Sequence, residues 1–329
     1  MDTRERSRAG APGVSRPGAA GPTAPVISVG NIAMGGRGKT PVVAHVARLL
    51  IESGERPAIL SRGYRRRRHE DGVVIVSDGT RLVADLDRAG DEPLMLARMV
   101  PGAAVLVCDV RAIAAAVAEH QLDATVHILD DGFQHRSLRR DVDIVVIRPG
   151  DLLGRRMPFG KLRSPVSSLQ RAHALIVEGD EQSLFGIARL SDAAVRRPEA
   201  FTMTRTIGAP EPLEPTRPWP AGRWPVVAVA GIAEPLRFTR SLQMAGWLVA
   251  RTMGFADHHP YSARDVQKIA EAVRETGAGA VLTTTKDAMR LLPWRPLPVP
   301  VAAVPLDVTI DPPDAFRAWL LARVREARA

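Results

Sequence analysis

The sequence predicts an α/β protein whose larger unit contains a mostly parallel β-sheet flanked by helices, followed by a second, smaller α/β unit. Two observations lead to this prediction. Short apolar runs alternate with segments of helical periodicity along most of the chain, which is typical of β-α-β units. In addition, a glycine-rich segment lies between the first apolar run and the first helical pattern, as in P-loop nucleotide-binding proteins.

The predicted strands of the larger unit are short and rich in Val, Ile and Leu, as expected for parallel strands that are buried on both faces. They lie at residues 25–30, 57–63, 72–78, 104–109, 125–131, 142–147 and 174–179. The predicted helices lie at residues 41–51, 91–99 and 111–120.

The smaller unit shows the same alternation. Strands are predicted at residues 225–235, 246–255, 280–288 and 300–310, with a first helix at 236–245. Ser262 and Asp265 have the spacing of a capping box, which predicts a second helix that ends at Gly277. Pro312 and Pro313 predict the start of a terminal helix that extends to about residue 328.

Composition divides the chain into four segments. Residues 1–24 are rich in Arg, Gly, Pro and Ala without periodicity, which predicts a disordered basic tail. Residues 25–204 form the predicted nucleotide-binding domain, and the Pro- and Gly-rich residues 205–224 form a connector. Residues 225–329 form the smaller α/β domain, and the sequence leaves open on which domain the terminal helix packs.

The overall composition limits the classes of function. The 329 residues are 45% hydrophobic and 25% charged, as in ordinary globular proteins, and no apolar run approaches the ~20 residues of a membrane-spanning helix. A net charge of +9 favours an anionic partner. Aromatic residues make up only 4% of the chain and are not interleaved with basic ones, which argues against nucleic acid.

The glycine-rich segment has the spacing of a relaxed P-loop, in which Ala or Gly is followed by four residues and then by Gly-Lys-Ser/Thr. Its backbone N–H groups would surround a phosphate chain, Lys39 would reach the β- and γ-phosphates, and Thr40 would ligate magnesium. The predicted ATP-binding residues are Ala33, Met34, Gly35, Gly36, Arg37, Gly38, Lys39 and Thr40.

Three further groups of polar residues lie at the ends of predicted elements. Asp130 and Asp131 end a strand, where a P-loop enzyme places a carboxylate that organises its metal ion, although an Asp-Gly turn gives the same pattern. Asp91 and Glu92 begin a predicted helix, where they would either orient an acceptor or cap the helix. His258 adjoins Asp257 in a loop, where an imidazole would modulate the basicity of a carboxylate.

Seven motifs occur in an order that resembles the tetraacyldisaccharide 4'-kinase family, which acts in lipid A biosynthesis. They are "SVGNIAMGGRGKTP", "LSRGY", "GDEPLMLAR", "LDDGFQHRSLRRDVDIVV", "AVAGIAEPLRF", "DHHPYSARD" and "TTTKDA". The resemblance extends from Pro25 to about residue 310. The "DDGFQHRSLRRD" motif, and "GDEP" together with "DHH", are the specific ones, whereas many NTPases share the P-loop.

The resemblance implies transfer of the ATP γ-phosphate to the 4'-hydroxyl of a tetraacylated glucosamine disaccharide 1-phosphate. It implies a peripheral enzyme at the cytoplasmic face of the bacterial inner membrane, bound to an anionic membrane surface, with no obligate protein partner and no nucleic acid. Asp130 and Asp131 would take the metal positions with Mg²⁺. Asp91 would be the catalytic base, and His258 of the second domain would pair with it when the domains close.

The resemblance also implies positions on the substrate or phosphate side of the site. They are Ser61, Arg62, Gly63, Tyr64, Glu92, Gln134, His135 and Asp257.

The chain departs from the family pattern in three places. A short basic tail stands where the family has an amphipathic or membrane-inserting N-terminal helix. Arg65 to Arg68 replace loop glycines, and they would either hold anionic groups or form a solvated basic loop. Thr285 stands where the family has glutamate.

Two other functions stay open from the sequence alone. One is a P-loop kinase or ATPase that acts on a soluble metabolite, which would not need a dispersed acylated substrate. The other is a non-catalytic nucleotide-dependent switch, for which the net charge of +9 and the arginine run are the motivation.

Overall fold

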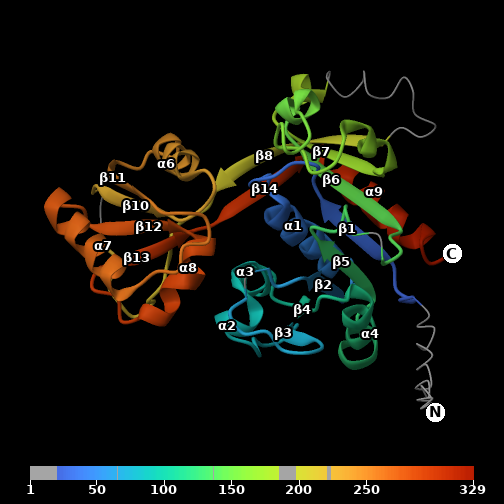
Figure 1. Cartoon of the computed structure of the whole chain (residues 1–329), viewed down its shortest axis with the longest axis horizontal. Coiled ribbons are helices and arrows are strands. Elements are labelled where there is room, and N and C mark those ends of the chain that lie inside the picture. Colours follow the sequence, from blue (N-terminus) through green and yellow to red (C-terminus); the bar gives the residue numbers. More distant parts are fainter. Residues whose placement is uncertain (1–20, 65, 136, 185–197, 221–223) are drawn as a thin grey trace, which may run out of the picture.

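Two β-sheets, each with its own helices, make up the molecule, and two strands run between them (Figure 1). The structure is a computed structural model that describes residues 21–64, 66–135, 137–184, 198–220 and 224–329. Most of the predicted basic tail lies outside these residues. At its described end, Thr23 and Ala24 donate backbone hydrogen bonds to the carboxylate of Glu119.

The large sheet confirms the predicted α/β class. Within the described residues its nine strands lie in the order β14-β8-β7-β6-β1-β5-β2-β4-β3, and of these only β3 and β14 are antiparallel to their neighbours. Their bounds are β1 Val26–Gly30, β2 Pro57–Ser61, β3 Val74–Asp78, β4 Ala104–Val107, β5 Val126–Asp130, β6 Val142–Ile147, β7 Ala174–Glu178, β8 Glu199–Ile207 and β14 Leu306–Asp311.

Alternate strand residues fill two cores on opposite faces of the large sheet. Ile27, Ile59 and Ile128 pack on one face against helices α1, α3 and α9. Val26 and Leu60 pack on the other face, against α4. The helical bounds are α1 Lys39–Glu52, α2 Leu86–Ala89, α3 Asp91–Met99, α4 Arg111–Leu122 and α9 Pro313–Glu326, with single-turn helices η1 Pro149–Leu153, η2 Val166–Arg171 and η3 Glu181–Leu184.

The small sheet has five strands in the order β11-β10-β12-β13-β9, all parallel except β9. The strands are β9 Glu211–Pro212, β10 Val226–Ala230, β11 Val249–Gly254, β12 Ala280–Thr284 and β13 Val301–Val304, and the helices are α6 Pro235–Met244, α7 Ala263–Thr276, α8 Thr285–Leu291 and η4 Leu292–Trp294. The capping box at α7 is confirmed, because Ser262 and Asp265 bond reciprocally and the helix ends at Gly277 with φ 64°.

Two strand predictions in the second half of the chain are wrong in detail. The predicted strand at 280–288 ends at Thr284, where α8 begins, because the Thr284 hydroxyl accepts a hydrogen bond from the backbone N–H of Asp287. The predicted strand at 300–310 is two strands in different sheets, β13 and β14, separated by Pro305, which has no N–H to donate.

The chain crosses between the two sheets through β8 and β14, which pair antiparallel from Leu306↔Ile207 to Asp311↔Thr202 (Figure 1). Strand β8 includes the first residues of the predicted connector 205–224, and β9 lies within it. Helix α9 then packs on the large sheet, where Phe316 and Phe201 meet edge to face. The domain boundaries expected from composition stay a prediction.

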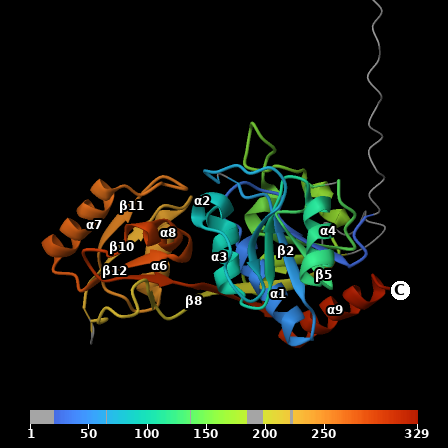
Figure 2. The same ribbon diagram turned by 90° about the horizontal axis from the view of Figure 1, so that it is seen from below.

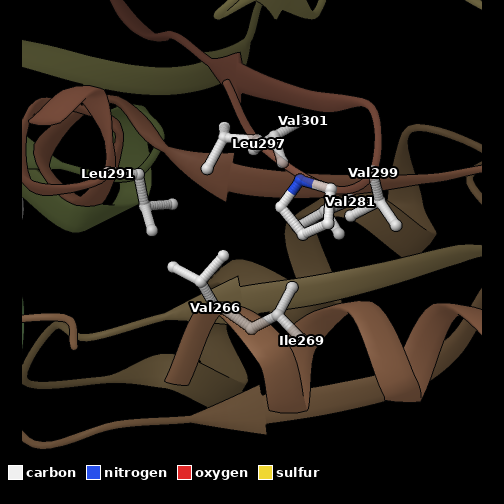
Figure 3. A pocket seen from close by; sticks show the side chains of 8 residues that line it. Val266, Ile269, Val281, Leu291, Leu297, Val299 and Val301 are labelled. Carbon is white, nitrogen blue, oxygen red and sulfur yellow. The ribbon is translucent and has the colours of Figure 1, made fainter. Parts of the chain in front are cut away.

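A small cavity lies in the core of the second domain between α7, β12 and β13 (Figure 3). Only apolar side chains line it, among them Val266, Ile269 and Leu297. Such a cavity is a gap in packing rather than a site for a polar ligand. In Figure 2 the two domains lie side by side with α3 and α8 between them, and these helices bring together the residues described next.

Candidate functional site

The glycine-rich segment lies between β1 and α1, at the carboxyl edge of the large sheet. Gly35 and Gly38 have φ values of 92° and 81°, in the left-handed region that glycine adopts without strain. A Cβ atom at Gly38 would lie 2.7 Å from a guanidinium nitrogen of Arg205, so a larger residue would displace that side chain. The segment therefore has the backbone of a loop that can surround an anion at a helix N-terminus.

Three of the predicted ATP-binding residues anchor the loop, Arg37 and Ala33 through buried side chains and Met34 through its backbone. Arg37 is buried and forms an ion pair with Asp151 at 2.7 Å. The backbone of Met34 donates to the carbonyl of Lys161 at 2.8 Å, and Ala33 is buried. The residues that stay at least partly accessible along the loop and the first turn of α1 are Met34, Gly35, Gly36, Gly38, Lys39, Thr40 and Pro41.

Asp131 holds two cations at the end of β5. Its carboxylate lies 3.3 Å from Lys39 Nζ and accepts two hydrogen bonds from Arg163, at 2.8 and 2.9 Å. Burial raises the pKa of Asp131, but Arg163 and Lys39 outweigh burial and lower it to about 2. Its φ of 56° is in the left-handed region, which costs a non-glycine residue energy and is common at functional sites.

Asp130, in contrast to Asp131, is not in an ion pair with any described residue. It pairs in register with Val29 of β1 and is almost fully buried, and no hydrogen bond or ion pair reaches its carboxylate from the residues described. Burial raises its pKa to about 7, and the negative charges of Glu92 and Asp131 add to the shift. A buried carboxylate with two acidic neighbours is a site that favours a cation.

A second cluster joins the two domains through Asp91, the first residue of α3. Asp91 Oδ2 lies 3.0 Å from His258 Nδ1 and also accepts hydrogen bonds from the guanidinium of Arg290. Lys286 Nζ lies 3.0 Å from His258 Nε2 and 2.9 Å from Glu92 Oε1. Because a protonated lysine only donates, His258 Nε2 accepts and Nδ1–H donates to Asp91.

Asp91 is buried yet ionised. Burial raises its pKa, but the hydrogen bond from His258 and the charges of Lys286 and Arg290 outweigh burial and hold the pKa below the usual range. His258 has a φ of 63°, and its backbone N–H donates to the carbonyl of Gly231 at 3.2 Å. Asp91 and Lys286 thus hold the two ring nitrogens of the imidazole. Asp257 lies 3.9 Å from Nε2.

The lowered pKa of Asp91 predicts the sign of a pH effect on stability. A carboxyl whose folded pKa is depressed contributes stability above its unfolded pKa, and that contribution is lost as pH falls through the folded pKa. We therefore expect the Tm difference between the wild type and Asp91→Asn to be largest near neutral pH and to shrink below about pH 4. Thermal unfolding of both proteins across this range checks it, and a difference that grows toward acid would contradict it.

Helix α8 supplies the cations of this cluster. Lys286 and Arg290 are four residues apart, so they lie on one face of the helix, toward Asp91. The fully buried Asp287 fixes the helix, because it accepts from the Gly231 backbone, the Tyr261 hydroxyl and Arg290. Burial and the charge of Asp287 raise the pKa of Tyr261, so the phenol stays a hydrogen-bond donor.

The predicted substrate-side residues after β2 line the same edge. Ser61 is buried, and its carbonyl accepts from the backbone of Cys108. Gly63 has a φ of 66°, and a Cβ there would lie 2.4 Å from Val107. Tyr64 is exposed and meets the His258 ring edge to face, with centroids 6.0 Å apart.

Several arginine side chains lie near His135, which follows Asp130 and Asp131 in the chain. Burial and the charges of Arg111, Arg62 and Arg140 lower the pKa of His135, which lies near these guanidinium groups. Gln134 has a positioning role, because its amide donates to the carbonyl of Asn31 at 2.6 Å.

The arginine run after Tyr64 is not a row of free guanidinium groups. Arg66 is buried, Arg67 lies 3.6 Å from Asp87, and Arg68 lies 3.4 Å from Glu70. Arg65 lies outside the described residues.

No role was predicted from the sequence for four residues of these clusters, Arg111, Arg163, Lys286 and Arg290, although Lys286 lies in the "TTTKDA" motif. Arginine is so common here that no pattern distinguishes the three that matter. Lys286 did have a signal, because it is one of only four lysines in the chain.

Comparison with known proteins gives one consistent result. The model of a family described as LpxK, tetraacyldisaccharide-1-P 4'-kinase, matches residues 6–325. A tetraacyldisaccharide 4'-kinase of Geobacter metallireducens is 40% identical over 82% of this chain and 79% of its own. One from Syntrophus aciditrophicus is 34% identical over 92% of this chain and 84% of its own.

A solved structure shows the same fold. The crystal structure of LpxK from Aquifex aeolicus in complex with ATP superposes with a TM-score of 0.72 at 32% identity. The match covers 92% of this chain and 88% of that one.

Proposed function

Because the chain belongs to the tetraacyldisaccharide 4'-kinase family, we propose that its candidate site transfers the γ-phosphate of ATP to the 4'-hydroxyl of a tetraacylated glucosamine disaccharide 1-phosphate. One observation carries the proposal. Asp91 of the large domain and His258 of the small domain lie 3.0 Å apart, and Glu92 links them electrostatically to the P-loop edge. A proton acceptor thus lies beside a phosphate-binding loop.

In this proposal each charged group has one task. Lys39 and the loop N–H groups bind the phosphates, and Asp91 accepts the proton of the 4'-hydroxyl. The bond between the 4'-oxygen and the γ-phosphorus forms as the bond to the β–γ bridging oxygen breaks, and ADP leaves. His258 orients the carboxylate, and its own position depends on Lys286.

The depressed pKa of Asp91 makes it a weak base as it stands. Lys286 and Arg290 are the charges that lower this pKa. An incoming phosphate offsets those charges, so nucleotide binding would raise the basicity of Asp91. Proton transfer from the 4'-hydroxyl to Asp91 would therefore be favoured only after ATP has bound.

The proposed Mg²⁺ has a suitable place at Asp130. Its carboxylate is buried near two other acidic groups, and the charges of Lys39 and Arg111 offset them only in part, without a hydrogen bond or ion pair to Asp130 among the described residues. Thr40 lies in the first turn of α1. Asp131 is less suited as a direct ligand, because Lys39 and Arg163 occupy its oxygens. Mg²⁺ would neutralise charge on the phosphates, and Asp130 with Thr40 would hold it.

We expect Asp130→Asn to make the metal-free protein more stable, because it removes a buried carboxyl whose ionised form is destabilised by burial and by the charges of Glu92 and Asp131. Mg²⁺ should raise the Tm of the wild type by several degrees and that of the variant hardly at all. Differential scanning calorimetry at neutral pH, with and without Mg²⁺, measures both. An equal Mg²⁺ shift in the two proteins would remove Asp130 from the metal site.

The proposed location is the cytoplasmic face of the bacterial inner membrane, with peripheral attachment to an anionic surface. The described part of the chain contains no helix that is long and apolar enough to cross a bilayer. We propose that neither nucleic acid nor an obligate protein partner takes part.

The test is phosphate transfer from radiolabelled ATP to detergent-dispersed tetraacyldisaccharide 1-phosphate in the presence of Mg²⁺. We expect labelled lipid from the wild type and none above background from Asp91→Ala. If the wild type binds ATP and labels no lipid, the acceptor is a different molecule, such as a soluble metabolite. Binding of ATP without transfer to any acceptor would instead indicate a nucleotide-dependent switch.

A further inference from the structure

Residues 153–161, from the last residue of η1 to the residue before the buried Leu162, form a loop with an unusual surface (the 153–161 loop). Leu153 is 90% exposed, Phe159 is 85% exposed and Met157 is 56% exposed. Exposed apolar side chains are ordinary when scattered, but three within seven residues form a local apolar tip.

The charges of the 153–161 loop are all of one sign. Arg155, Arg156 and Lys161 are exposed, the segment has no acidic residue, and none of the three is in an ion pair with a described residue. Arg67 and Arg68, by contrast, already have acidic partners. Apolar tips flanked by free cations are the composition that binds the interface of an anionic bilayer.

The base of the 153–161 loop is rigid. The backbone of Leu162 donates to the carbonyl of Arg155 at 3.0 Å, and Met157 donates back to Leu162 at 3.0 Å. A Cβ at Gly160 would lie 2.1 Å from the Arg155 carbonyl, so this close approach requires glycine. The apolar side chains are therefore held outward by a short hairpin instead of collapsing onto the protein.

The end of the 153–161 loop lies directly beside the candidate site. The Met34 backbone donates to the carbonyl of Lys161, and Arg163, two residues later, holds Asp131. In Figure 2 a green loop from this part of the chain extends beyond the large sheet on the side away from α9. A bilayer that contacts its tip would thus face the edge of the sheet where the P-loop lies.

We propose that the 153–161 loop inserts Leu153, Met157 and Phe159 into an anionic phospholipid bilayer, while Arg155, Arg156 and Lys161 bind the headgroups. The inference rests on the proposed lipid kinase function and names the surface that meets the membrane. Because the base of the loop is rigid, insertion of its tip would fix the distance between the bilayer and the edge of the sheet where the P-loop lies.

A direct test attaches an environment-sensitive fluorophore to the loop tip of the full chain. Cys108 is buried and is the only cysteine, so Phe159→Cys can be labelled selectively. With vesicles of phosphatidylcholine and roughly one-third phosphatidylglycerol, we expect a blue shift and a several-fold rise in emission. A label at Met244→Cys, on equally exposed α6, is the matched control and should not respond.

Cosedimentation with the same vesicles measures how much the apolar and the basic side chains of the loop each contribute to membrane binding. We expect Leu153→Ser/Phe159→Ser to weaken vesicle binding about tenfold or more, and Arg155→Gln/Arg156→Gln to weaken it similarly and reduce its salt dependence. Met244→Ser/Leu248→Ser, which removes exposed apolar groups of the small domain, should bind as the wild type does. All variants should keep the wild-type kcat in detergent micelles, where no bilayer is present.

Three results would overturn the inference. The first is wild-type vesicle binding by both loop variants. The second is unchanged vesicle binding with a raised KM for micellar lipid, which would mean that the loop holds substrate acyl chains. The third is self-association of the wild type that the loop variants lose in sedimentation equilibrium. Failure of the proposed function is distinct, because it would show as absent lipid phosphorylation by the wild type in micelles.

Discussion

Replacing Asp91 with alanine should lower kcat for the lipid by about 10²- to 10⁴-fold, the loss typical of removing a general base. ATP affinity should not fall, because Asp91 contacts His258 and Arg290 rather than the P-loop and its negative charge does not favour phosphate binding. Steady-state kinetics with detergent-dispersed substrate gives kcat, and titration with a non-hydrolysable ATP analogue gives the affinity. A kcat close to that of the wild type would exclude Asp91 from the mechanism.

The alanine variant also removes one of the two carboxylate partners of the buried Arg290 and leaves only Asp287, so a control must separate chemistry from folding. Asp91→Asn keeps the shape and an acceptor oxygen but removes the charge. If it retains most of the wild-type Tm and loses as much kcat as Asp91→Ala, the loss reflects the missing proton acceptor.

His258→Ala should reduce kcat less than Asp91→Ala, because the base remains and only its orientation and environment change. If the pair acts as a unit, the double variant should lose no more than Asp91→Ala alone. An unchanged kcat/KM for the lipid in His258→Ala would show that the contact between the domains is structural only.

The sequence was sufficient for those parts of the site that depend on local spacing. The P-loop, the Asp130–Asp131 pair at a strand end and the capping box at Ser262 are each defined by a few neighbouring residues, and the strand and helix ends beside them lie within two residues of their predicted places. Where a residue lies along a strand or helix depends mainly on the residues next to it in the chain, so a short segment is enough to predict it.

The missing parts depend on contacts between distant segments. Asp91 and His258 are 167 residues apart, and only the family resemblance suggested their pairing. Arg290 reaches Asp91 because α8 packs against α3, and the first four residues of α8 were predicted as the end of the strand at 280–288. The signal for this helix was present, since Thr284 and Asp287 have the spacing of an N-cap and its first-turn acid.

Strand β14 shows a second limit of local patterns. Residues 300–310 are apolar almost throughout, so nothing in their periodicity indicates that the two halves join different sheets. The pairing with β8 decides this, and strand pairing is not encoded in a single segment.

Replacing Lys39 with alanine should abolish measurable turnover, with kcat reduced by about 10³-fold or more, because the lysine charge stabilises the transferring phosphoryl group. The fold should tolerate the change, since Asp131 keeps both hydrogen bonds from Arg163 and Lys39 is partly exposed. Lys268→Ala is the matched control: it removes the same side chain from an exposed position of α7 and should keep the wild-type kcat. The Tm values of both variants should lie close to that of the wild type. A Lys39→Ala protein that keeps a tenth or more of the wild-type kcat would mean that the loop binds phosphate without this lysine and that the cation serving transfer is another, with Arg163 the nearest candidate.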